Sequence, residues 1–185
     1  GLKGKTVIGY IGTHGLAQGL DFIITAIAEI PSKEVHFLFI GDGSEKERVK
    51  KLARQWKLQN ITFLDSVPKQ EIAKYLSVCD ICLVPLKRSD TFKTVIPSKI
   101  FEAAAMKKPV LLGVSGQAKE IIEKYGAGIC YEPENKADFI EKLLLVTQNK
   151  VLYEQLQDGC EQLAKDFNRK NLANIMLREL ETVYE

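Results

Sequence analysis

Short apolar runs alternate along the chain with longer stretches in which hydrophobic residues recur every three or four positions. The short runs contain few polar residues, which is typical of strands that a parallel sheet buries on both faces. They predict six strands, at Val7–Ile11, Val35–Ile40, Ile61–Leu64, Ile81–Pro85, Val110–Val114 and Gly128–Tyr131.

The longer stretches predict helices between and after these strands. Five lie between strands and three follow the last strand, at Leu20–Glu29, Glu45–Trp56, Lys69–Val78, Pro97–Met106, Ala118–Tyr125, Lys136–Asn149, Leu152–Ala164 and Lys170–Val183. Ser44 with Glu47, and Asn135 with Asp138, have the spacing of residues that cap helix N-termini. The alternation predicts an α/β domain with a Rossmann-like, doubly wound parallel sheet of about six strands and C-terminal helices.

The composition agrees with one globular domain and narrows the range of partners. Hydrophobic residues make up 45% and charged residues 27% of the 185-residue chain, as in ordinary globular domains. The net charge is only +2, and the basic residues are interleaved with acidic ones, so nucleic acid is not an expected partner. No apolar run approaches the ~18 residues that a membrane span requires.

The start of the chain and its cysteines bear on its setting. The chain begins at Gly1, without an initiator Met or the apolar core of a signal peptide, so we expect an excised piece of a longer protein. Cys79 and Cys82 have C-x-x-C spacing, but no second pair or nearby His completes a zinc site. We interpret them as packing residues, and four cysteines at this length favour a reducing, cytoplasmic setting.

Ligands bind beyond the carboxyl ends of the strands in doubly wound sheets, so the loops that follow strands are the candidate sites. The first of these loops runs from Gly12 to Asp21 and contains three glycines, which allow the backbone to approach a phosphate closely. It lacks the G-x-G-x-x-G fingerprint of dinucleotide-binding proteins. Within it, His14 is either a donor to a phosphate or sugar oxygen or a loop residue with no special role.

Three more loops lie at the same predicted edge. The residues Gly41 to Ser44 have the composition of a tight turn into a helix, and they could also line a cleft. The residues Asp65 to Pro68 offer backbone groups that could bind the edge of a base. The loop from Lys87 to Lys93 carries three cations, and it is either a solvated loop or a segment that closes over phosphates.

The segment that begins at Pro97 is the most informative of the chain. Pro97 fits the first turn of a helix, where its missing N–H costs nothing. The amides of Ser98, Lys99 and Ile100 would then be unpaired donors at the positive end of the helix dipole. With Glu102 one turn further on, the segment suits a ligand that has phosphates at one end and hydroxyls at the other. A surface Lys and a solvated Glu on an ordinary helix are the alternative.

Taken in order, these elements resemble the C-terminal, donor-binding domain of GT-B glycosyltransferases, particularly the large retaining family 4. The resemblance covers nearly the whole chain, and each stretch is weak alone while the ordered set is specific. The matching stretches are Gly12 to Asp21, Phe39 to Gly43, Asn60 to Pro68, Cys79 to Ile81, Pro97 to Ala105, Lys108 to Val110 and Gly126 to Gly128. It implies one half of a GT-B fold, the other half being a missing N-terminal domain.

The resemblance assigns roles and also shows departures from the family pattern. Glu102 matches the second Glu of a Glu-x7-Glu motif, which holds the ribose hydroxyls of the sugar nucleotide. The first Glu contacts the donor sugar, and that position is Thr94 here. The first-loop cations that clamp the diphosphate are replaced by Thr13 and Gln18. More of the countercharge for the diphosphate therefore falls to Lys99.

Lys87, Arg88 and Lys93 are further candidates to replace the missing cations. No catalytic residue is assigned beyond Lys99, which would stabilise the departing diphosphate. The residues expected at the donor site are Gly12, Thr13, His14, Gly15, Gln18, Val67, Thr94, Pro97, Ser98, Lys99 and Glu102. No Asp-x-Asp motif is present, so the resemblance implies transfer without a metal or other cofactor.

The resemblance also implies an activity for the full-length protein. This chain would bind a nucleoside diphosphate sugar, with UDP preferred by analogy, and the missing domain would bring a saccharide or lipid-linked acceptor to the inner membrane face. The Pro-Ser-Lys-x-x-Glu segment resembles that of bacterial enzymes that make capsule, O-antigen and related exopolysaccharides. The isolated domain should bind nucleotide weakly and turn over nothing, with the helix at 170–185 packing toward the missing domain.

Two other functions remain open. A nonhydrolysing sugar-nucleotide epimerase shares the two-domain architecture, but it needs acid/base residues at the cleft, and the loops offer only Glu102, Asp42 and His14. A non-catalytic α/β binding or regulatory module is also compatible with the fold, since fold alone does not determine function.

Overall fold

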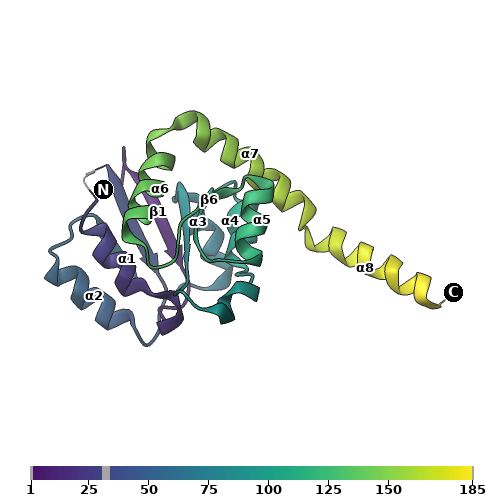
Figure 1. Ribbon diagram of the computed structural model, residues 1–185, viewed down its shortest axis with the longest axis horizontal. Helices are drawn as coiled ribbons and strands as arrows, with labels where there is room; N and C mark the ends of the chain where they lie inside the picture. Colours follow the sequence, from purple (N-terminus) through teal and green to yellow (C-terminus); the bar gives the residue numbers. More distant parts are fainter. Residues whose placement is uncertain (1, 31–33, 185) are drawn as a thin grey trace.

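Six parallel strands form a single sheet in the computed structural model, which describes residues 2–30 and 34–184 (Figure 1). The strand order β3-β2-β1-β4-β5-β6 means that the chain winds outward from β1 in both directions. The strands are β1 (Thr6–Ile11), β2 (Val35–Ile40), β3 (Ile61–Leu64), β4 (Ile81–Pro85), β5 (Val110–Gly113) and β6 (Gly128–Cys130). The predicted doubly wound α/β fold is confirmed, while Gly1 and Glu185 lie outside the described residues.

The central strand β1 pairs with β2 on one side and with β4 on the other. Ile8 lies opposite Phe37 of β2 and opposite Ile81 of β4. Because successive side chains of a strand point to opposite faces, Ile8 and Tyr10 face one layer of helices while Val7 faces the other. All six residues of β2 are buried, which is why only His36 interrupts its apolar run.

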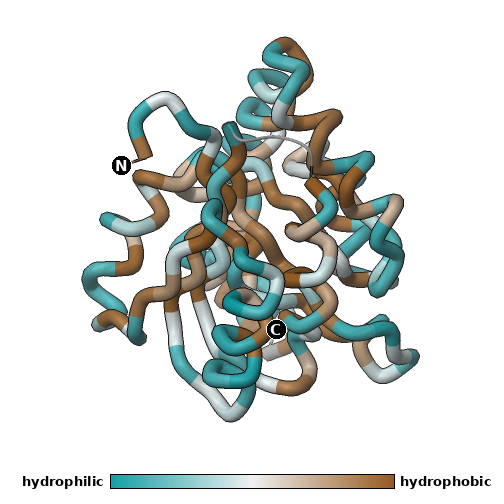
Figure 2. Tube along the Cα trace, turned by 90° about the vertical axis from the view of Figure 1, so that its left-hand side faces the viewer, coloured by the Kyte–Doolittle hydropathy of each residue, from teal (hydrophilic) through white to brown (hydrophobic). Residues whose placement is uncertain are grey.

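Helices α1 (Leu20–Ile27), α2 (Lys46–Gln55) and α6 (Lys136–Gln148) cover one face of the sheet. Their apolar side chains pack on the aliphatic and aromatic side chains that the four central strands present on this face, among them those of Phe37 and Phe39. The tube in Figure 2 shows hydrophobic segments running through the middle of the molecule, with hydrophilic segments mostly at its periphery.

The other face is covered by α3 (Ile72–Ser77), α4 (Lys99–Ala105), α5 (Gln117–Tyr125) and α7 (Lys150–Asp166). Here Ile100, Ala103 and Ala104 of α4 are completely or almost completely buried against β4 and β5. The small alanine side chains allow α4 to approach both the sheet and α7 closely. This packing fixes the position of the helix that carries Lys99 and Glu102.

The predicted helices are confirmed with shifted ends. The helix predicted at Lys69–Val78 is divided into a 3-10 turn, η2 (Lys69–Glu71), and the α-helix α3. Two more 3-10 turns, η1 (Leu16–Gln18) and η3 (Asp90–Thr94), lie in loops after β1 and β4. The predicted cap at Asn135 is confirmed, since its side chain accepts a hydrogen bond from the Asp138 amide at 3.2 Å.

The predicted capping box of Ser44 and Glu47 is wrong. The helix α2 has Glu45 at its N-cap, and no side chain caps it. The amide of Glu45 donates instead to the His14 carbonyl at 2.8 Å, and that of Lys46 donates to the Gly43 carbonyl at 3.1 Å. Backbone carbonyls of the two preceding loops therefore bind the amides at the start of α2, in place of a side-chain cap.

The last helix, α8 (Arg169–Tyr184), projects away from the sheet at the end of α7 (Figure 1). Its exposed large apolar side chains are Leu172, Ile175, Met176, Leu177, Leu180 and Val183. No helix in the described part of the chain is both long enough and apolar enough to cross a membrane.

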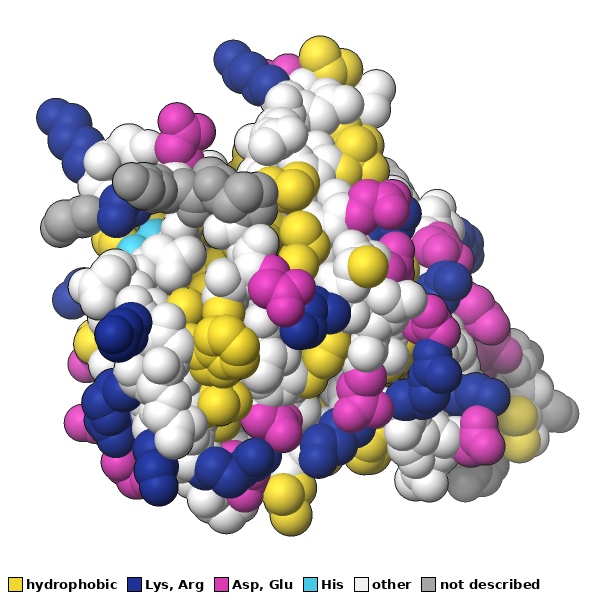
Figure 3. All heavy atoms as spheres, turned by 60° about the vertical axis from the view of Figure 1, so that its left-hand side comes forward, with side chains coloured by type: hydrophobic (Ala, Val, Ile, Leu, Met, Phe, Trp, Pro, Cys, Tyr) yellow, Lys and Arg dark blue, Asp and Glu magenta, His cyan; other side chains and the backbone are white. Residues whose placement is uncertain are grey.

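The distribution of surface charge and the burial of Cys79 and Cys82 agree with the predictions from the sequence. On the face that Figure 3 presents, Lys and Arg side chains lie among Asp and Glu side chains instead of gathering in one patch. Cys79 and Cys82 are free and buried, as their interpretation as packing residues predicts. Burial raises the pKa of the Cys79 thiol to about 11, so this sulfur stays protonated and inert at neutral pH.

Candidate functional site

The loops after β1 and β2 are joined by backbone hydrogen bonds at the carboxyl edge of the sheet. The Gly12 amide donates to the Ile40 carbonyl and the His14 amide to the Asp42 carbonyl, both at 2.8 Å. The two chains approach so closely that a Cβ on Gly41, whose φ is +142°, would lie 1.9 Å from the Gly12 oxygen. Only glycine fits there, and the two loops form one rigid platform.

An apolar hollow of about 250 Å³ opens beside this platform. Its walls combine aliphatic side chains with the backbone of three loops, and its lining residues are Ile11, Gly12, Thr13, Ile40, Gly41, Asp42, Ser66, Val67 and Ile72. Apolar walls with a few polar groups among them are typical of small-molecule binding pockets.

A second, narrower hollow of about 20 Å³ continues from the first, and the two share Ile11 and Ile72. Lys99 and Glu102 of α4 line it. A Cβ on Gly12 would lie 2.7 Å from Lys99 Nζ, so the ammonium group rests on the bare backbone of the first loop. The two hollows together form one furrow, which we call the donor furrow.

The start of α4 differs from the prediction. The helix begins at Lys99 with Ser98 as its N-cap residue, so Pro97 precedes the first turn instead of lying in it. The Ile100 amide donates to the Pro97 carbonyl at 3.1 Å and is not free for a ligand. Within residues 2–30 and 34–184, the amides of Ser98 and Lys99 donate to no protein group. Two of the three predicted donors therefore remain.

The structure contradicts one of the two roles expected of His14, that of a side-chain donor to a phosphate or sugar oxygen. Its side chain is fully buried, with its ring 5.5 Å from that of Tyr10 and 6.3 Å from that of Phe39. Neither ring nitrogen has a hydrogen-bond partner among the described residues. Burial, and then the nearby Lys46 cation, lower its pKa from 6.5 to about 4. A side-chain contact from His14 to a phosphate or sugar oxygen is therefore wrong for this structure, and its backbone organises the loops instead.

The structure brings together only part of the predicted set. Five predicted residues line the donor furrow, namely Gly12, Thr13, Val67, Lys99 and Glu102. The others, which line neither hollow, are His14, Gly15, Gln18, Thr94, Pro97 and Ser98. Gln18 is engaged locally, because its Oε1 accepts from the Gly15 amide at 3.1 Å.

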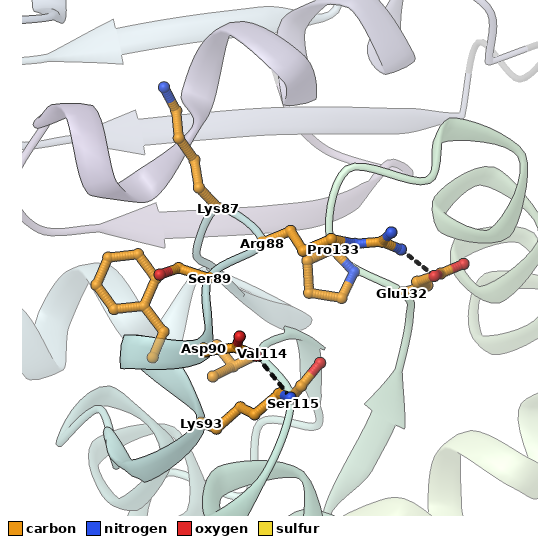
Figure 4. Close-up of a pocket in the computed structure, with 10 residues that line it drawn as sticks. Lys87, Arg88, Ser89, Asp90, Lys93, Val114, Ser115, Glu132 and Pro133 are labelled. Carbon is orange, nitrogen blue, oxygen red and sulfur yellow. Dashed lines mark hydrogen bonds and ion pairs between the residues drawn. The ribbon is translucent and has the colours of Figure 1, made fainter.

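The cationic loop after β4 borders a third hollow, of about 290 Å³ (Figure 4). Arg88 forms an ion pair with Glu132, and Lys93 pairs with Asp90 at 2.7 Å. Lys87 points away from these pairs (Figure 4). Two of the three cations proposed as substitutes for diphosphate ligands are thus already neutralised, and Lys87 stays a prediction.

Sequence reasoning missed Lys46, a cation that is only 5% exposed. Its Nζ donates to the Gly41 carbonyl at 2.8 Å and to Asp65 Oδ1 at 2.7 Å. A signal was present, because Lys46, Val49 and Ala53 share one helix face by their spacing, and the last two are buried apolar residues.

No group of three or more His, Cys, Asp or Glu side chains in the described ranges could hold a metal ion. The two hollows are lined by backbone groups, apolar side chains, the Lys99 cation and the carboxylates of Asp42 and Glu102. Their chemistry is that of binding an anionic, hydroxyl-bearing ligand with a flat apolar end.

Comparison with known proteins agrees with this chemistry. Residues 5–149 match the model of a family described as glycosyl transferases, group 1. The chain is 32% identical over 128 residues to "Probable glycosyltransferase WbjE" of Pseudomonas aeruginosa. The aligned region covers 68% of this chain and 32% of that protein. It is 29% identical over 165 residues to WcaI of Escherichia coli K12, whose name assigns it to colanic acid biosynthesis, with 81% of this chain and 38% of WcaI covered.

A solved structure gives the fold a precedent. The crystal structure of Anabaena Alr3699/HepE in complex with UDP has a TM-score of 0.85 and 18% identity, covering 98% of this chain and 50% of that one. The likeness at this identity concerns the fold alone. The chain spans between 32% and 38% of the length of the two curated relatives.

Proposed function

Because the chain belongs to the group 1 glycosyl transferases, we propose that it forms the donor-binding half of a retaining GT-B glycosyltransferase. The donor is a sugar carried by a nucleoside diphosphate, with UDP preferred. The observation that carries this proposal is the donor furrow, in which Lys99 rests on the bare backbone of Gly12, a residue that lines the adjoining apolar hollow.

Each part of the furrow suits one part of such a donor. The base lies in the apolar hollow, against Val67 and Ile72. The Glu102 carboxylate, exposed and one helical turn from Lys99, accepts hydrogen bonds from the ribose hydroxyls. The diphosphate lies between Lys99 and the free amides at the start of α4. Its charge grows as the sugar departs, so the Lys99 ammonium stabilises the transition state more than the ground state.

Two relatives support the choice of donor and pathway. The fold neighbour Alr3699/HepE was crystallised with UDP, and WcaI is named for the synthesis of colanic acid, a polysaccharide. We propose by extension that the full-length protein serves in capsule, O-antigen or exopolysaccharide synthesis, within the Pro-Ser-Lys-x-x-Glu subgroup. The transfer proceeds without a metal or other cofactor in this proposal.

The acceptor side lies outside this chain in the same proposal. A preceding N-terminal domain brings a saccharide or lipid-linked acceptor at the cytoplasmic face of the inner membrane. The row of exposed apolar side chains on α8, from Leu172 to Val183, packs against that domain. The chain alone would then bind nucleotide and transfer nothing.

Titration calorimetry with UDP, GDP, ADP, CMP and inorganic phosphate tests the proposal. We expect UDP to bind more tightly than phosphate, and Glu102→Gln to weaken UDP by about tenfold through loss of a charge-assisted hydrogen bond. The control is Glu120→Gln, which changes an exposed carboxylate in the first turn of α5. If no nucleotide binds better than phosphate, the donor site is disproved. An unchanged UDP affinity in Glu102→Gln removes this residue from the ribose role.

A further inference from the structure

Lys46 is a buried cation at the N-terminus of α2, a position where a helix dipole disfavours positive charge. Its side chain is 6% exposed. A buried ammonium is stable only where partners replace its lost hydration. The groups that bind the Lys46 ammonium therefore indicate its role.

The partners of Lys46 come from two different loops. The Gly41 carbonyl, 2.8 Å from Nζ, directly follows β2, and the Asp65 carboxylate, 2.7 Å from Nζ, directly follows β3. These loops form adjoining walls of the apolar hollow, through Gly41 and Asp42 on one side and Ser66 and Val67 on the other. Lys46 itself does not line the hollow. It therefore crosslinks the loops after β2 and β3 from outside the hollow.

The crosslink is asymmetric. The backbone of Gly41 is held in place by the interlocked first loop, whereas the Asp65 side chain is 90% exposed. Lys46 holds the pKa of the Asp65 carboxyl below its usual value, so this carboxylate is charged throughout the neutral range. Without the ammonium, Asp65 would turn to water, and the loop that carries Val67 would be held only by the packing of Val67 on the core and by the adjacent Gly41 amide bond to Leu64, at 3.3 Å.

We propose that Lys46 is a positioning residue that sets the width of the hollow and thereby the affinity for the nucleoside part of the donor, without touching it. This role rests on the proposed function, because it takes the hollow as the site of the base. It separates two contributions within one furrow. Lys99 acts on the diphosphate, while Lys46 acts on the base through the two loops.

The test measures the affinities of UDP, uridine and inorganic diphosphate for matched variants by calorimetry. Lys46→Met keeps the aliphatic stem and removes the charge. We expect it to weaken UDP and uridine by the same factor, about tenfold, because the buried hydrogen bond to Gly41 and the half-buried one to Asp65 are lost and the walls move apart. The affinity for diphosphate should not change, and Lys46→Arg should restore most of the affinity for uridine.

Two further variants make the test decisive. Lys50→Met is the control, since Lys50 lies one turn along α2 and its one ion pair within residues 2–30 and 34–184 is with Glu47, at 3.0 Å. The affinities of this variant should stay within about twofold of the wild type. Asp65→Asn changes an exposed group, so it preserves the fold if Lys46→Met does not fold, and it should weaken uridine by about threefold.

The outcomes distinguish this inference from the proposal beneath it. A wild-type chain that binds neither UDP nor uridine overturns the proposed function and this role together. A wild-type chain that binds both, with Lys46→Met and Asp65→Asn unchanged, overturns the role of Lys46 alone. Equal weakening of diphosphate and uridine also overturns it, because that pattern indicates general damage to the fold.

Discussion

The two ends of the donor furrow are built in opposite ways. At the apolar end, backbone hydrogen bonds join the loops after β1 and β2, and the buried Lys46 ties the loop after β2 to the loop after β3. At the charged end, neither Lys99 nor Glu102 forms an ion pair within the described residues, and Glu102 has only a 3.4 Å contact with the Ser98 hydroxyl. The first end is fixed before a ligand arrives, and the second is not.

The two ends of the furrow should therefore contribute to ligand recognition in different ways. A rigid hollow discriminates by shape and loses little entropy when a ring enters it. The unpaired side chains of Lys99 and Glu102 on α4 instead lose rotamer freedom on binding. Only a ligand that supplies the complementary charge offsets this loss of entropy. Substitutions at the apolar end should therefore affect folding as well as binding, whereas substitutions at the charged end should affect binding alone.

The largest expected effect is on stability at the apolar end. Gly41→Ala should lower the free energy of unfolding by about 3 kcal/mol or more, because its Cβ would meet the Gly12 backbone at 1.9 Å. The matched control is Gly126→Ala, where φ is +59° and nothing lies within 4 Å, so about 1 kcal/mol is expected. Urea unfolding measures both losses. Equal losses would mean that the loops are not interlocked.

The next effect belongs to the charged end. Lys99→Ala should weaken UDP by about 30-fold, since it removes a charge-assisted contact to the diphosphate, while uridine affinity stays within about twofold. Lys119→Ala, on the exposed side of α5, is the control. Calorimetry and thermal unfolding together decide the question. If UDP and uridine weaken alike, or the variant melts at a clearly lower temperature, the two ends do not differ as described.

The buried His14 makes the stability of the apolar end dependent on pH. Its pKa is about 4 in the folded chain and near 6.5 when unfolded, so the unfolded state binds more protons as the pH falls. The contribution of neutral His14 to the free energy of unfolding is fully present above pH 6.5. The free energy of unfolding should fall by about 2 kcal/mol between pH 7 and pH 5. His14→Phe should abolish most of this loss in denaturant titrations at both pH values.

His36 provides the comparison for that experiment. It is also buried, but its Nε2 lies 2.9 Å from the Thr62 hydroxyl, and its pKa is lowered chiefly by burial. His36→Phe should leave most of the pH dependence in place. If it removes as much as His14→Phe does, the acid sensitivity does not originate at the joined loops.

The smallest effect is expected in the loop after β4. Arg88→Ala removes the exposed ion pair with Glu132, and it should change the free energy of unfolding by less than about 1 kcal/mol. UDP affinity should stay within about twofold, because Arg88 is already neutralised. A tenfold loss of UDP affinity would instead assign Arg88 to the diphosphate and extend the charged end of the furrow.

Most of the fold could be predicted because the buried strands leave an unmistakable pattern. The run at Val35–Ile40 has no polar gap except His36, since helices cover both faces of β2. Helix ends were less predictable. The His14 carbonyl, in a distant loop, accepts from the amide of Glu45 at the N-cap of α2, and no property of Ser44 or Glu47 could reveal that.

The site was predictable where its chemistry depends on the backbone or on loop position. Gly12, Val67 and Glu102 follow strands or start a helix, so topology alone brings them to one edge. The direction of the His14 side chain was not predictable, because an irregular loop has no periodicity that indicates which face is buried. The partner of Lys46 was equally hidden, since Asp65 lies 19 residues away in the chain.

The position of β1 has a consequence for how this chain is made. β1 lies between β2 and β4 in the sheet, and an Asp80 carboxylate oxygen just before β4 accepts a bond from the Val7 amide across 73 residues of sequence. During synthesis, β1 and β2 emerge long before β4 does, so one edge of the central strand stays unpaired. The exposed edge is a template for aggregation until translation reaches β4. The loop that follows β1 is thus among the first parts of the furrow to be made and among the last to be enclosed.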